Sequence, residues 1–281
     1  MRPKQWAKNG ILFAALVFSK NVFHLRSLTL SVTAFVLFCL LSGGVYLFND
    51  LMDIANDRKH PIKSQRPLAS GRLNPRAAKI ASIVCFIISL TGCFLINFPL
   101  GVISSGYLIL QIGYSTWLKE ILLIDMFAIS AGFFLRAVAG AKAIGVPISS
   151  WLLICTIFAS LFLGLGKRRH ELVLLGEDAT EHRKVFDGYN VGLLDQMVSV
   201  VTAGTVVSYS LYTLSQETVR RFDTENLWLT IPIVLYGIFR YLYLVYRKGE
   251  GGHPELSFFG DRPLLITIAL YAVVVGIILY W

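Results

Sequence analysis

The stretch LTLSVTAFVLFCLLSGGVYLFNDLMDIANDRKHPIKSQRPLASGR, residues 28–72, joins an apolar segment to a dense cluster of polar side chains. Residues 28–48 are long enough to cross a bilayer as a helix. Asn49, Asp50, Asp53 and Asp57 follow at helical spacing, and a basic segment comes directly after them. The stretch therefore predicts a membrane helix that opens into an acidic site at the membrane surface.

The composition of the whole chain is typical of a polytopic membrane protein. Hydrophobic residues make up 55% of the 281 residues and charged residues 15%, whereas soluble domains carry about 25% charged residues. The formal charge of +9 lies in loops between apolar runs. Membrane topology and anionic substrates explain this charge better than nucleic acid does, so no nucleic-acid partner is expected. The four cysteines lie inside apolar runs, and neither a metal site nor a disulfide is expected from them.

Apolar runs of about 20 residues predict an all-α membrane protein with nine transmembrane helices. No linker or break in composition interrupts the chain, so residues 1–281 are predicted to form one domain. The expected spans are residues 9–23, 28–50, 76–97, 99–117, 122–141, 149–166, 193–214, 227–246 and 263–281.

The distribution of Lys and Arg between the loops predicts the orientation. The loops on the side of the N-terminus carry 19 of these residues, and those on the opposite side carry 5. Positive charge is retained on the cytoplasmic side, so the N-terminus is predicted to be cytoplasmic in the inner (plasma) membrane. Every long polar loop then falls on the same side, and the active site is expected to face the cytoplasm.

The spacing of the three aspartates suits a divalent cation. On a continuous helix, Asp50, Asp53 and Asp57 would project within about 60° of arc. Mg²⁺ takes oxygen ligands and often binds through one or two carboxylates together with substrate phosphates. A solvated helix end, with these acids paired to the basic residues that follow, is the alternative. The cost of charges beside a membrane span favours a functional site.

The pattern N-D-x-x-D-x-x-x-D at residues 49–57, with R-P-L-A-S-G-R at residues 66–72, resembles the first signature of the UbiA superfamily of intramembrane prenyltransferases. The span count and the placement of the polar loops extend the resemblance over essentially the whole chain. It implies a nine-helix bundle in which the three aspartates bind Mg²⁺ and diphosphate. It also implies that Asn49 orients or completes this shell, and that Lys63 and Arg66 contact phosphate oxygens.

The chain departs from that superfamily after the sixth expected span. Most members carry a second motif, D-x-x-x-D, where this chain has GKRRHEL at residues 166–172. Lys167 and Arg168 stand among bases in place of acids, and Glu171 remains. Glu177 and Glu181 have a spacing similar to that of the missing pair, farther along the loop. More cations predict a greater capacity for phosphate, either on the donor or on the acceptor.

Further stretches resemble one branch of the superfamily, the decaprenyl-phosphate phosphoribosyltransferases. These are RPKQWAKN at residues 2–9, YSTWLKEILLIDMFAISAGFFLRAVAGA at residues 114–141, and GKRRHEL. Such enzymes move 5-phosphoribose from phosphoribosyl diphosphate (PRPP) to a polyprenyl phosphate, so the resemblance implies an Mg²⁺-dependent glycosyltransferase. Attack of the lipid phosphate on the opposite face of C1 predicts inversion. The remaining substrate-binding candidates are Lys8, Asn9, Tyr114, Lys119 and Arg136.

Two alternatives remain at this point. A UbiA-type prenyltransferase would move an isoprenoid from its diphosphate to an aromatic or glyceryl-phosphate acceptor, although the missing second aspartate motif counts against it. A cation-coupled membrane transporter is the other alternative. Transporters usually place charges near the membrane midplane on broken helices, whereas these acids lie at a helix end. The sequence leaves the oligomeric state open, a homo-oligomer included.

Overall fold

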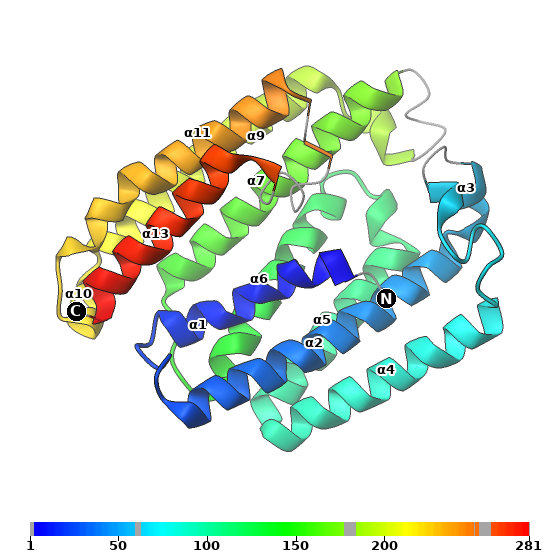
Figure 1. Ribbon diagram of the computed structural model, residues 1–281. Coiled ribbons are helices and arrows are strands. Elements are labelled where there is room, and N and C mark those ends of the chain that lie inside the picture. The colour runs from blue at the N-terminus through cyan, green and yellow to red at the C-terminus, as the bar shows by residue number, and fades with distance from the viewer. Residues whose placement is uncertain (1–2, 60–62, 177–183, 250, 253–259, 281) are drawn as a thin grey trace. The chain divides into compact units, whose positions relative to one another are not determined.

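A computed structural model describes residues 3–59, 63–176, 184–249, 251–252 and 260–280. Helices are the regular elements of this part of the chain (Figure 1). Contacts divide the chain into two compact units, which are described separately below. The expectation of one domain over residues 1–281 stays a prediction. Unit 1 comprises Met1–Val17, Asn21–Val146 and Thr180–Asp187, and unit 2 comprises Phe18–Lys20, Pro147–Ala179 and Gly188–Trp281.

Unit 1 is built on four long helices and several short elements. The short 3-10 helix η5 (Lys184–Gly188) lies where the chain passes from one unit to the other. The elements of unit 1 are η1 (Pro3–Phe13), α1 (Ala14–Val17), α2 (Leu25–Met52), α3 (Ile54–Lys59), η2 (Lys63–Gln65), α4 (Pro75–Ile96), α5 (Phe98–Thr116), η3 (Leu118–Glu120) and α6 (Ile124–Ile144).

Helices α2 and α4 pack side by side (Figure 1). Gly44 lies against the Phe86 ring, and Ser82 Oγ donates a hydrogen bond to the Gly44 carbonyl at 2.9 Å. The core of the unit draws residues such as Phe38 and Tyr107 from α2 and α5. Small residues at the crossing therefore let the backbones approach, as is common between membrane helices.

A single residue joins α4 to α5. Asn97 ends α4, and its side chain accepts a hydrogen bond from the Leu100 backbone N–H at 2.8 Å, which caps α5. Pro99 stands in the first turn of α5, where its missing N–H costs nothing. The expected spans 76–97 and 99–117 are therefore the adjacent helices α4 and α5, which pack against each other.

The N-terminal segment η1 packs against α6 and α2. Gly140 of α6 makes this contact possible, because an added Cβ at this position would overlap the Leu12 carbonyl. The segment therefore lies on α6 with backbone against backbone.

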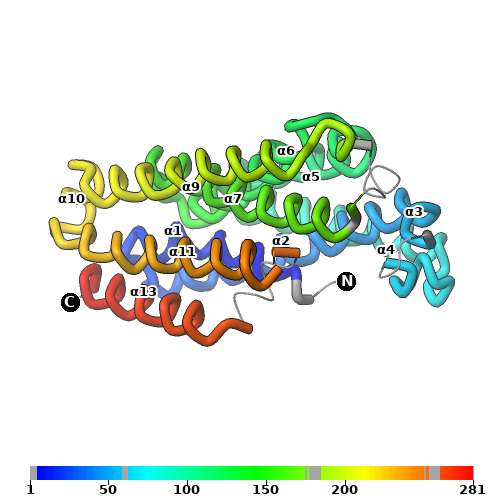
Figure 2. Tube along the Cα trace, turned by 90° about the horizontal axis from the view of Figure 1, so that it is seen from above, coloured from blue at the N-terminus to red at the C-terminus, as the bar shows by residue number. Residues whose placement is uncertain are grey.

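Unit 2 is also helical, and α7 and α9 pack along each other (Figure 2). Its core joins residues such as Tyr209 and Tyr212 of α9 to Leu227 and Val275 of later elements. The elements of unit 2 are α7 (Ser150–Leu175), α9 (Val191–Leu214), α10 (Gln216–Phe222), η6 (Asn226–Thr230), α11 (Ile231–Arg247) and α13 (Arg262–Tyr280).

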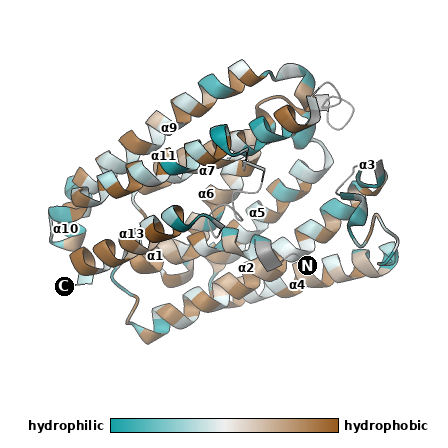
Figure 3. Ribbon diagram, turned by 45° about the horizontal axis from the view of Figure 1, so that its top comes forward, coloured by the Kyte–Doolittle hydropathy of each residue, from teal (hydrophilic) through white to brown (hydrophobic). Residues whose placement is uncertain are grey.

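Seven of the described helices are long and apolar enough to cross a membrane. Apolar residues are distributed along these helices, and hydrophilic residues gather at α3 (Figure 3). On α4, side chains such as Ile80 and Ile87 are 64% and 60% exposed, as is expected of a surface that faces lipid. The chain is therefore a multi-pass membrane protein.

The expected count of nine spans is not confirmed. Instead of one span over residues 9–23, the chain forms η1 and the short α1, and Lys20 adopts a left-handed conformation with φ of 58°. The span expected at residues 99–117 is α5, which has 19 residues but includes Ser104, Ser105 and Gln111, so it is less apolar than the seven. Polar residues therefore account for the second difference, and the left-handed backbone at Lys20 interrupts the first expected span.

Candidate active site

The acidic cluster lies at the end of α2, where that helix breaks. Asn49 and Asp50 belong to its last turn, Asp53 is its C-cap with φ −98° and ψ 7°, and Asp57 lies in α3. The continuous helix assumed for the spacing argument is therefore interrupted at Asp53. Backbone hydrogen bonds of helical spacing bridge the break, from Asp53 N–H to the Asn49 carbonyl at 3.0 Å and from Asp57 N–H to the Asp53 carbonyl at 2.8 Å. They keep the polar side chains together.

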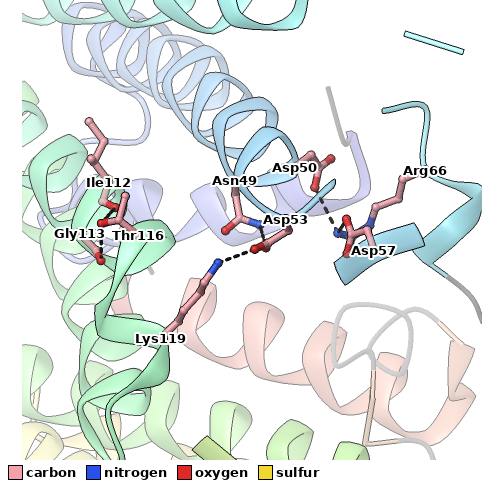
Figure 4. A network of polar contacts seen from close by, with 9 residues as sticks. All are labelled: Asn49, Asp50, Asp53, Asp57, Arg66, Ile112, Gly113, Thr116 and Lys119. Carbon is pink, nitrogen blue, oxygen red and sulfur yellow. Dashed lines mark hydrogen bonds and ion pairs between the residues drawn. The ribbon is translucent and has the colours of Figure 1, made fainter. Parts of the chain in front are cut away.

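Two cations of unit 1 pair with the three carboxylates (Figure 4). Arg66 Nη1 lies 3.2 Å from Asp50 Oδ1 and 2.6 Å from Asp57 Oδ2. Lys119 Nζ lies 2.5 Å from Asp53 Oδ1. The five predicted residues therefore form one cluster although they come from separate segments.

Asn49 belongs to the same cluster. Its Nδ2 donates a hydrogen bond to Asp53 Oδ2 at 2.9 Å, so both oxygens of this carboxylate have partners (Figure 4). The expected role of Asn49, to orient or complete a metal shell, stays a prediction. Asp50 and Asp57 are 9% and 5% exposed, and such shielding strengthens their ion pairs relative to pairs in open water.

A folded loop holds the backbone of Arg66. The Arg66 N–H donates to the Lys63 carbonyl at 3.0 Å, and the Arg66 carbonyl accepts from Ser70 N–H at 2.9 Å. Arg58 Nε donates to the Ala69 carbonyl at 3.2 Å, which ties the loop to α3. The segment R-P-L-A-S-G-R, residues 66–72, thus builds a turn as well as supplying a charge.

Arg72 and Gly71 complete that loop. Arg72 Nη2 donates to the Gln65 carbonyl at 2.5 Å, and its Nε donates to Ser70 Oγ at 3.1 Å. Gly71 has φ of +77°, a region that glycine enters without the strain of a Cβ. The loop-building roles of Arg58 and Arg72 were not predicted, since a basic run alone does not distinguish a structural arginine from a ligand.

Lys119 reaches the cluster from η3, which follows α5. At the end of α5, Thr116 Oγ1 donates to the carbonyls of Ile112 at 2.9 Å and Gly113 at 3.2 Å (Figure 4). Trp117 N–H also donates to the Gly113 carbonyl, at 3.0 Å. These bonds finish the helix and turn the chain toward α2. Tyr114, another predicted substrate-binding residue, is partly buried on α5.

Three carboxylates and an amide oxygen are ligands that Mg²⁺ prefers. Asp50 and Asp57 also direct their oxygens to one point, since both contact a single nitrogen of Arg66. The donor set therefore fits Mg²⁺ in chemistry. As arranged, however, the described residues contain no group of three or more His, Cys, Asp or Glu side chains that could hold a metal ion.

Arg136 lies in a buried polar network of unit 1, as expected of a charge that faces the bundle interior. It is 5% exposed, and its Nε donates to Asn9 Oδ1 at 2.8 Å while Nη2 donates to the Tyr107 hydroxyl at 2.6 Å. Asn9 is fully buried and donates in turn to Ser42 Oγ at 3.1 Å and Cys39 Sγ at 3.3 Å. Both candidates thus have protein partners, and Lys8, the residue before Asn9, is partly buried on η1.

The basic residues of α7 lie in unit 2 and on a helix. The span expected at residues 149–166 continues to Leu175, so Lys167, Arg168 and Glu171 are helical and not part of a loop. Arg168 is 2% exposed, and its Nη1 lies 3.1 Å from Glu171 Oε2. Lys167 is partly buried. Glu177 and Glu181 lie outside the described residues.

Arg169 and His170 have structural contacts of their own. Arg169 Nε lies 2.5 Å from Asp195 Oδ1 of α9, and its guanidinium stacks 4.2 Å from the Tyr246 ring centroid. Gly252 packs so closely on His170 that an added Cβ would lie 2.5 Å from its Cδ2 atom. Arg169 and His170 are therefore in contact with other parts of unit 2, so the basic residues of this segment of α7 are not all left to bind a ligand.

Sequence reasoning also missed a strong ion pair in unit 2. Arg240 Nε and Nη2 contact the two carboxylate oxygens of Asp261 at 3.0 and 2.8 Å, and Asp261 Oδ1 also accepts from Leu264 N–H at 3.0 Å. Asp261 thus caps α13 and pairs with α11. An arginine within an apolar span was the available signal, because such a charge needs a partner.

Comparison of the sequence with known proteins identifies its family and its relatives. The model of the "UbiA prenyltransferase family" matches residues 10–260. The decaprenyl-phosphate phosphoribosyltransferase of Corynebacterium glutamicum is 33% identical, over 95% of this chain and 81% of that protein. The enzyme of the same name from Mycolicibacterium smegmatis is 30% identical, over 100% of this chain and 91% of that protein.

Solved structures show the same fold. The UbiA homologue from Archaeoglobus fulgidus, determined with GPP and Mg²⁺, superposes with a TM-score of 0.72 at 18% identity, covering 100% of this chain and 98% of the other. The same homologue determined with DMAPP and Mg²⁺ gives 0.73 at 19% identity, covering 99% and 96%. The chain, a membrane-embedded transferase, therefore belongs to the UbiA prenyltransferase family.

Proposed function

We propose that this protein transfers 5-phosphoribose from PRPP to a polyprenyl phosphate and releases diphosphate. Similarity to decaprenyl-phosphate phosphoribosyltransferases over nearly the whole chain supports this reaction. The length of the polyprenyl chain is left unspecified. Each substrate carries phosphate outside the bond that breaks, which distinguishes the pair from a prenyl diphosphate with a neutral aromatic acceptor.

The observation that carries the proposal is the buried cation on α7. Arg168 is 2% exposed and lies against Glu171, in the segment where most UbiA enzymes have a second aspartate motif. A guanidinium held in this way is suited to grip phosphate with two parallel hydrogen bonds. Lys167 adds a positive charge beside it in the sequence. An excess of cations favours a reaction in which the acceptor is itself a phosphate.

The acidic cluster has the chemistry required at the donor. Asp50, Asp53 and Asp57 would hold Mg²⁺, which supplies Lewis-acid stabilisation of the departing diphosphate. Arg66 and Lys119 contact these carboxylates and can neutralise diphosphate oxygens as negative charge develops there. These residues therefore act on the leaving group.

Three further candidates complete the proposed substrate contacts of unit 1. Lys63 begins the turn that holds Arg66, and Lys8 and Tyr114 are partly buried on neighbouring elements of the same unit. We assign Lys63 and Lys8 to phosphate oxygens and Tyr114 to a hydrogen bond with the donor.

The nucleophile needs no dedicated general base. A phosphate monoester oxygen is already anionic at neutral pH, so it can attack C1 of the ribose directly. The sugar passes through an oxocarbenium-like state, as in other glycosyl transfers. We assign Lys167 and Arg168 to the lipid phosphate, and a single displacement at C1 gives inversion.

The bilayer supplies the acceptor. Each CH₂ of a polyprenyl chain contributes about 0.8 kcal/mol to remaining in an apolar phase, so a soluble enzyme could not readily extract it. We place the reaction at the cytoplasmic face of the plasma membrane, because the Lys and Arg bias of 19 to 5 assigns the long polar loops to that side.

A prenyl transfer of the ordinary UbiA type is the second candidate. The acidic cluster would serve any diphosphate donor, and the homologous structures were determined with the prenyl diphosphates GPP and DMAPP. A neutral aromatic acceptor leaves the cationic α7 segment unexplained, whereas a glyceryl-phosphate acceptor is distinguished from a polyprenyl phosphate by the donor it uses. A cation-coupled transporter would release no diphosphate when substrates are mixed.

The test is an assay of purified protein with three donor–acceptor pairs in lipid nanodiscs. We expect ribose-labelled PRPP to label polyprenyl phosphate, with release of diphosphate and inversion at C1. Geranyl diphosphate with 4-hydroxybenzoate, and with a glyceryl phosphate, should give no product. No labelled lipid from PRPP, or a prenylated product from either other pair, would reject the proposal.

A further inference from the structure

The carboxylates of the acidic cluster are held by cations of their own chain. One nitrogen of Arg66 bridges Asp50 and Asp57, and Lys119 Nζ lies 2.5 Å from Asp53 Oδ1 (Figure 4). Within the part of the chain that the structure describes, the acids are not arranged to hold a metal ion. The positive ends of these two side chains therefore stand where a divalent cation would have to approach.

We propose that Arg66 and Lys119 are exchangeable counter-ions. They neutralise the aspartates until a metal ion and a diphosphate arrive together, and they then transfer to the diphosphate oxygens. The inference rests on the proposed function only in requiring a donor that carries diphosphate. It adds that the ion pairs of Arg66 and Lys119 oppose binding of the metal alone, so the two ligands bind cooperatively.

Charge accounting explains the cooperativity. In the ion pairs that the described residues make here, the three aspartates contribute −3 and Arg66 and Lys119 contribute +2. A bare divalent cation would have to break these ion pairs, leaving Arg66 and Lys119 without anions at side-chain exposures of 25% and 17%. Breaking a shielded ion pair on one side is costly because the other charge is left uncompensated. Diphosphate removes that cost by giving both cations new acceptors.

Linkage makes the effect reciprocal. If diphosphate raises the affinity for the metal, the metal raises the affinity for diphosphate by the same factor. The coupling between two ligands is typically about 5- to 150-fold. Counter-ion exchange therefore predicts a coupling that depends on Arg66 and Lys119, beyond the affinity that metal and diphosphate have for each other in solution.

The backbone geometry permits the exchange without rearrangement of the fold. Backbone bonds to Lys63 and Ser70 hold Arg66 in its loop, and Lys119 lies in η3 beyond α5. Only the long side chains have to change rotamer. Because the two cations belong to different loops, each can be tested without disturbing the other.

The experiment titrates Mn²⁺, read by its electron paramagnetic resonance signal, into the purified full chain in detergent. Each titration is done alone and with methylene diphosphonate, a stable diphosphate, and no lipid acceptor or sugar is present. We expect Arg66→Gln to bind Mn²⁺ alone about 10-fold more tightly than the wild type and to lose most of the gain caused by the diphosphonate. Lys119→Gln should shift both quantities in the same direction.

Arg76→Gln is the matched control. Arg76 is exposed in the first turn of α4, and its replacement by Gln removes the same formal charge from the same unit. Its Mn²⁺ affinity should stay within about 2-fold of the wild type, given that exposed charges are strongly screened. A gain in the control equal to that of Arg66→Gln would attribute the effect to net charge and overturn the proposal.

Weaker or unchanged binding of Mn²⁺ alone in both Arg66→Gln and Lys119→Gln would also overturn it, because a counter-ion must compete with the metal. Thermal unfolding verifies that each variant is folded, and either variant suffices if the other does not fold. The diphosphonate is common to phosphoribosyl and prenyl donors. Intact exchange without phosphoribosyl transfer would therefore reject the proposed function and leave the counter-ion mechanism standing.

Discussion

Asn9→Ala removes the side chain that links η1 to two membrane helices. Asn9 is fully buried, accepts a hydrogen bond from Arg136 Nε at 2.8 Å, and donates to Ser42 Oγ and Cys39 Sγ. The variant leaves a guanidinium N–H and two further polar groups without this partner. We expect a marked loss of stability with no change in the charge of the chain.

The magnitude follows from these three bonds. A hydrogen bond to a charged group contributes about 1.5–3 kcal/mol. Polar contacts between membrane helices average about 0.6 kcal/mol each. The expected loss is therefore about 3 kcal/mol, roughly a 100-fold fall in the folding equilibrium constant. Asn9→Asp keeps the acceptor for Arg136 but loses both donors, so its loss should be smaller.

The assay is reversible unfolding of the detergent-solubilised protein in SDS, followed by tryptophan fluorescence. Asn226→Ala is the matched control: Asn226 is exposed at the start of η6, and its replacement should change the free energy of unfolding by less than about 0.5 kcal/mol. If Asn9→Ala fell within the same range, the network around Arg136 would contribute nothing to stability and the reasoning would be refuted.

Three further outcomes are expected. Asp50→Asn should lower metal-dependent turnover by about 100-fold or more, since it removes a proposed ligand of a Lewis acid that contributes several kcal/mol; near-normal kcat/KM at saturating Mg²⁺ would contradict the assignment. Gly140→Ala should lower the free energy of unfolding by about 1–3 kcal/mol through overlap with η1, whereas Gly276→Ala, with open space around its Cβ in α13, should raise it by about 0.5–1 kcal/mol; equal effects would refute the contact. The hydrogen bond from Arg240 holds the pKa of Asp261 below its ordinary value of 3.8, so the stabilisation by this carboxylate is present above that value and is lost as pH falls through the lower pKa; melting curves of Asp261→Asn and wild type should differ at neutral pH and converge in acid, and a constant difference would show another origin.

The sequence predicted the acidic end of α2 but not the break at Asp53. Helical spacing was visible, whereas the interruption lies beside a contact with Lys119, which is 66 residues away. Likewise, Arg66 was expected near phosphate, but its pairing with two carboxylates depends on a loop folded by other arginines. Local patterns therefore located the site, and long-range contacts determined its present arrangement.

The N-terminus and α7 show two different reasons for error. Gly10 and Lys20 were included in an apolar run, although the segment forms only short helical pieces. In contrast, α7 continues beyond its apolar part because its charges have partners along the helix: Arg168 pairs with Glu171 three residues on, and Arg169 with Asp195 of α9. The i, i+3 spacing of Arg168 and Glu171 was a usable helical signal.

The link between Asn9 and Arg136 has a consequence for biogenesis. The two residues are 127 positions apart, so a ribosome adding about 5–20 residues per second needs roughly 6–25 s to make the second after the first. An arginine at the centre of a newly inserted helix costs about 2.5–3.5 kcal/mol on translocon scales. The N-terminal segment must therefore stay unbound until α6 has been synthesised, so that Asn9 can pair with Arg136. A fusion partner that bound this segment earlier would leave Arg136 without Asn9 and make membrane insertion of α6 less favourable.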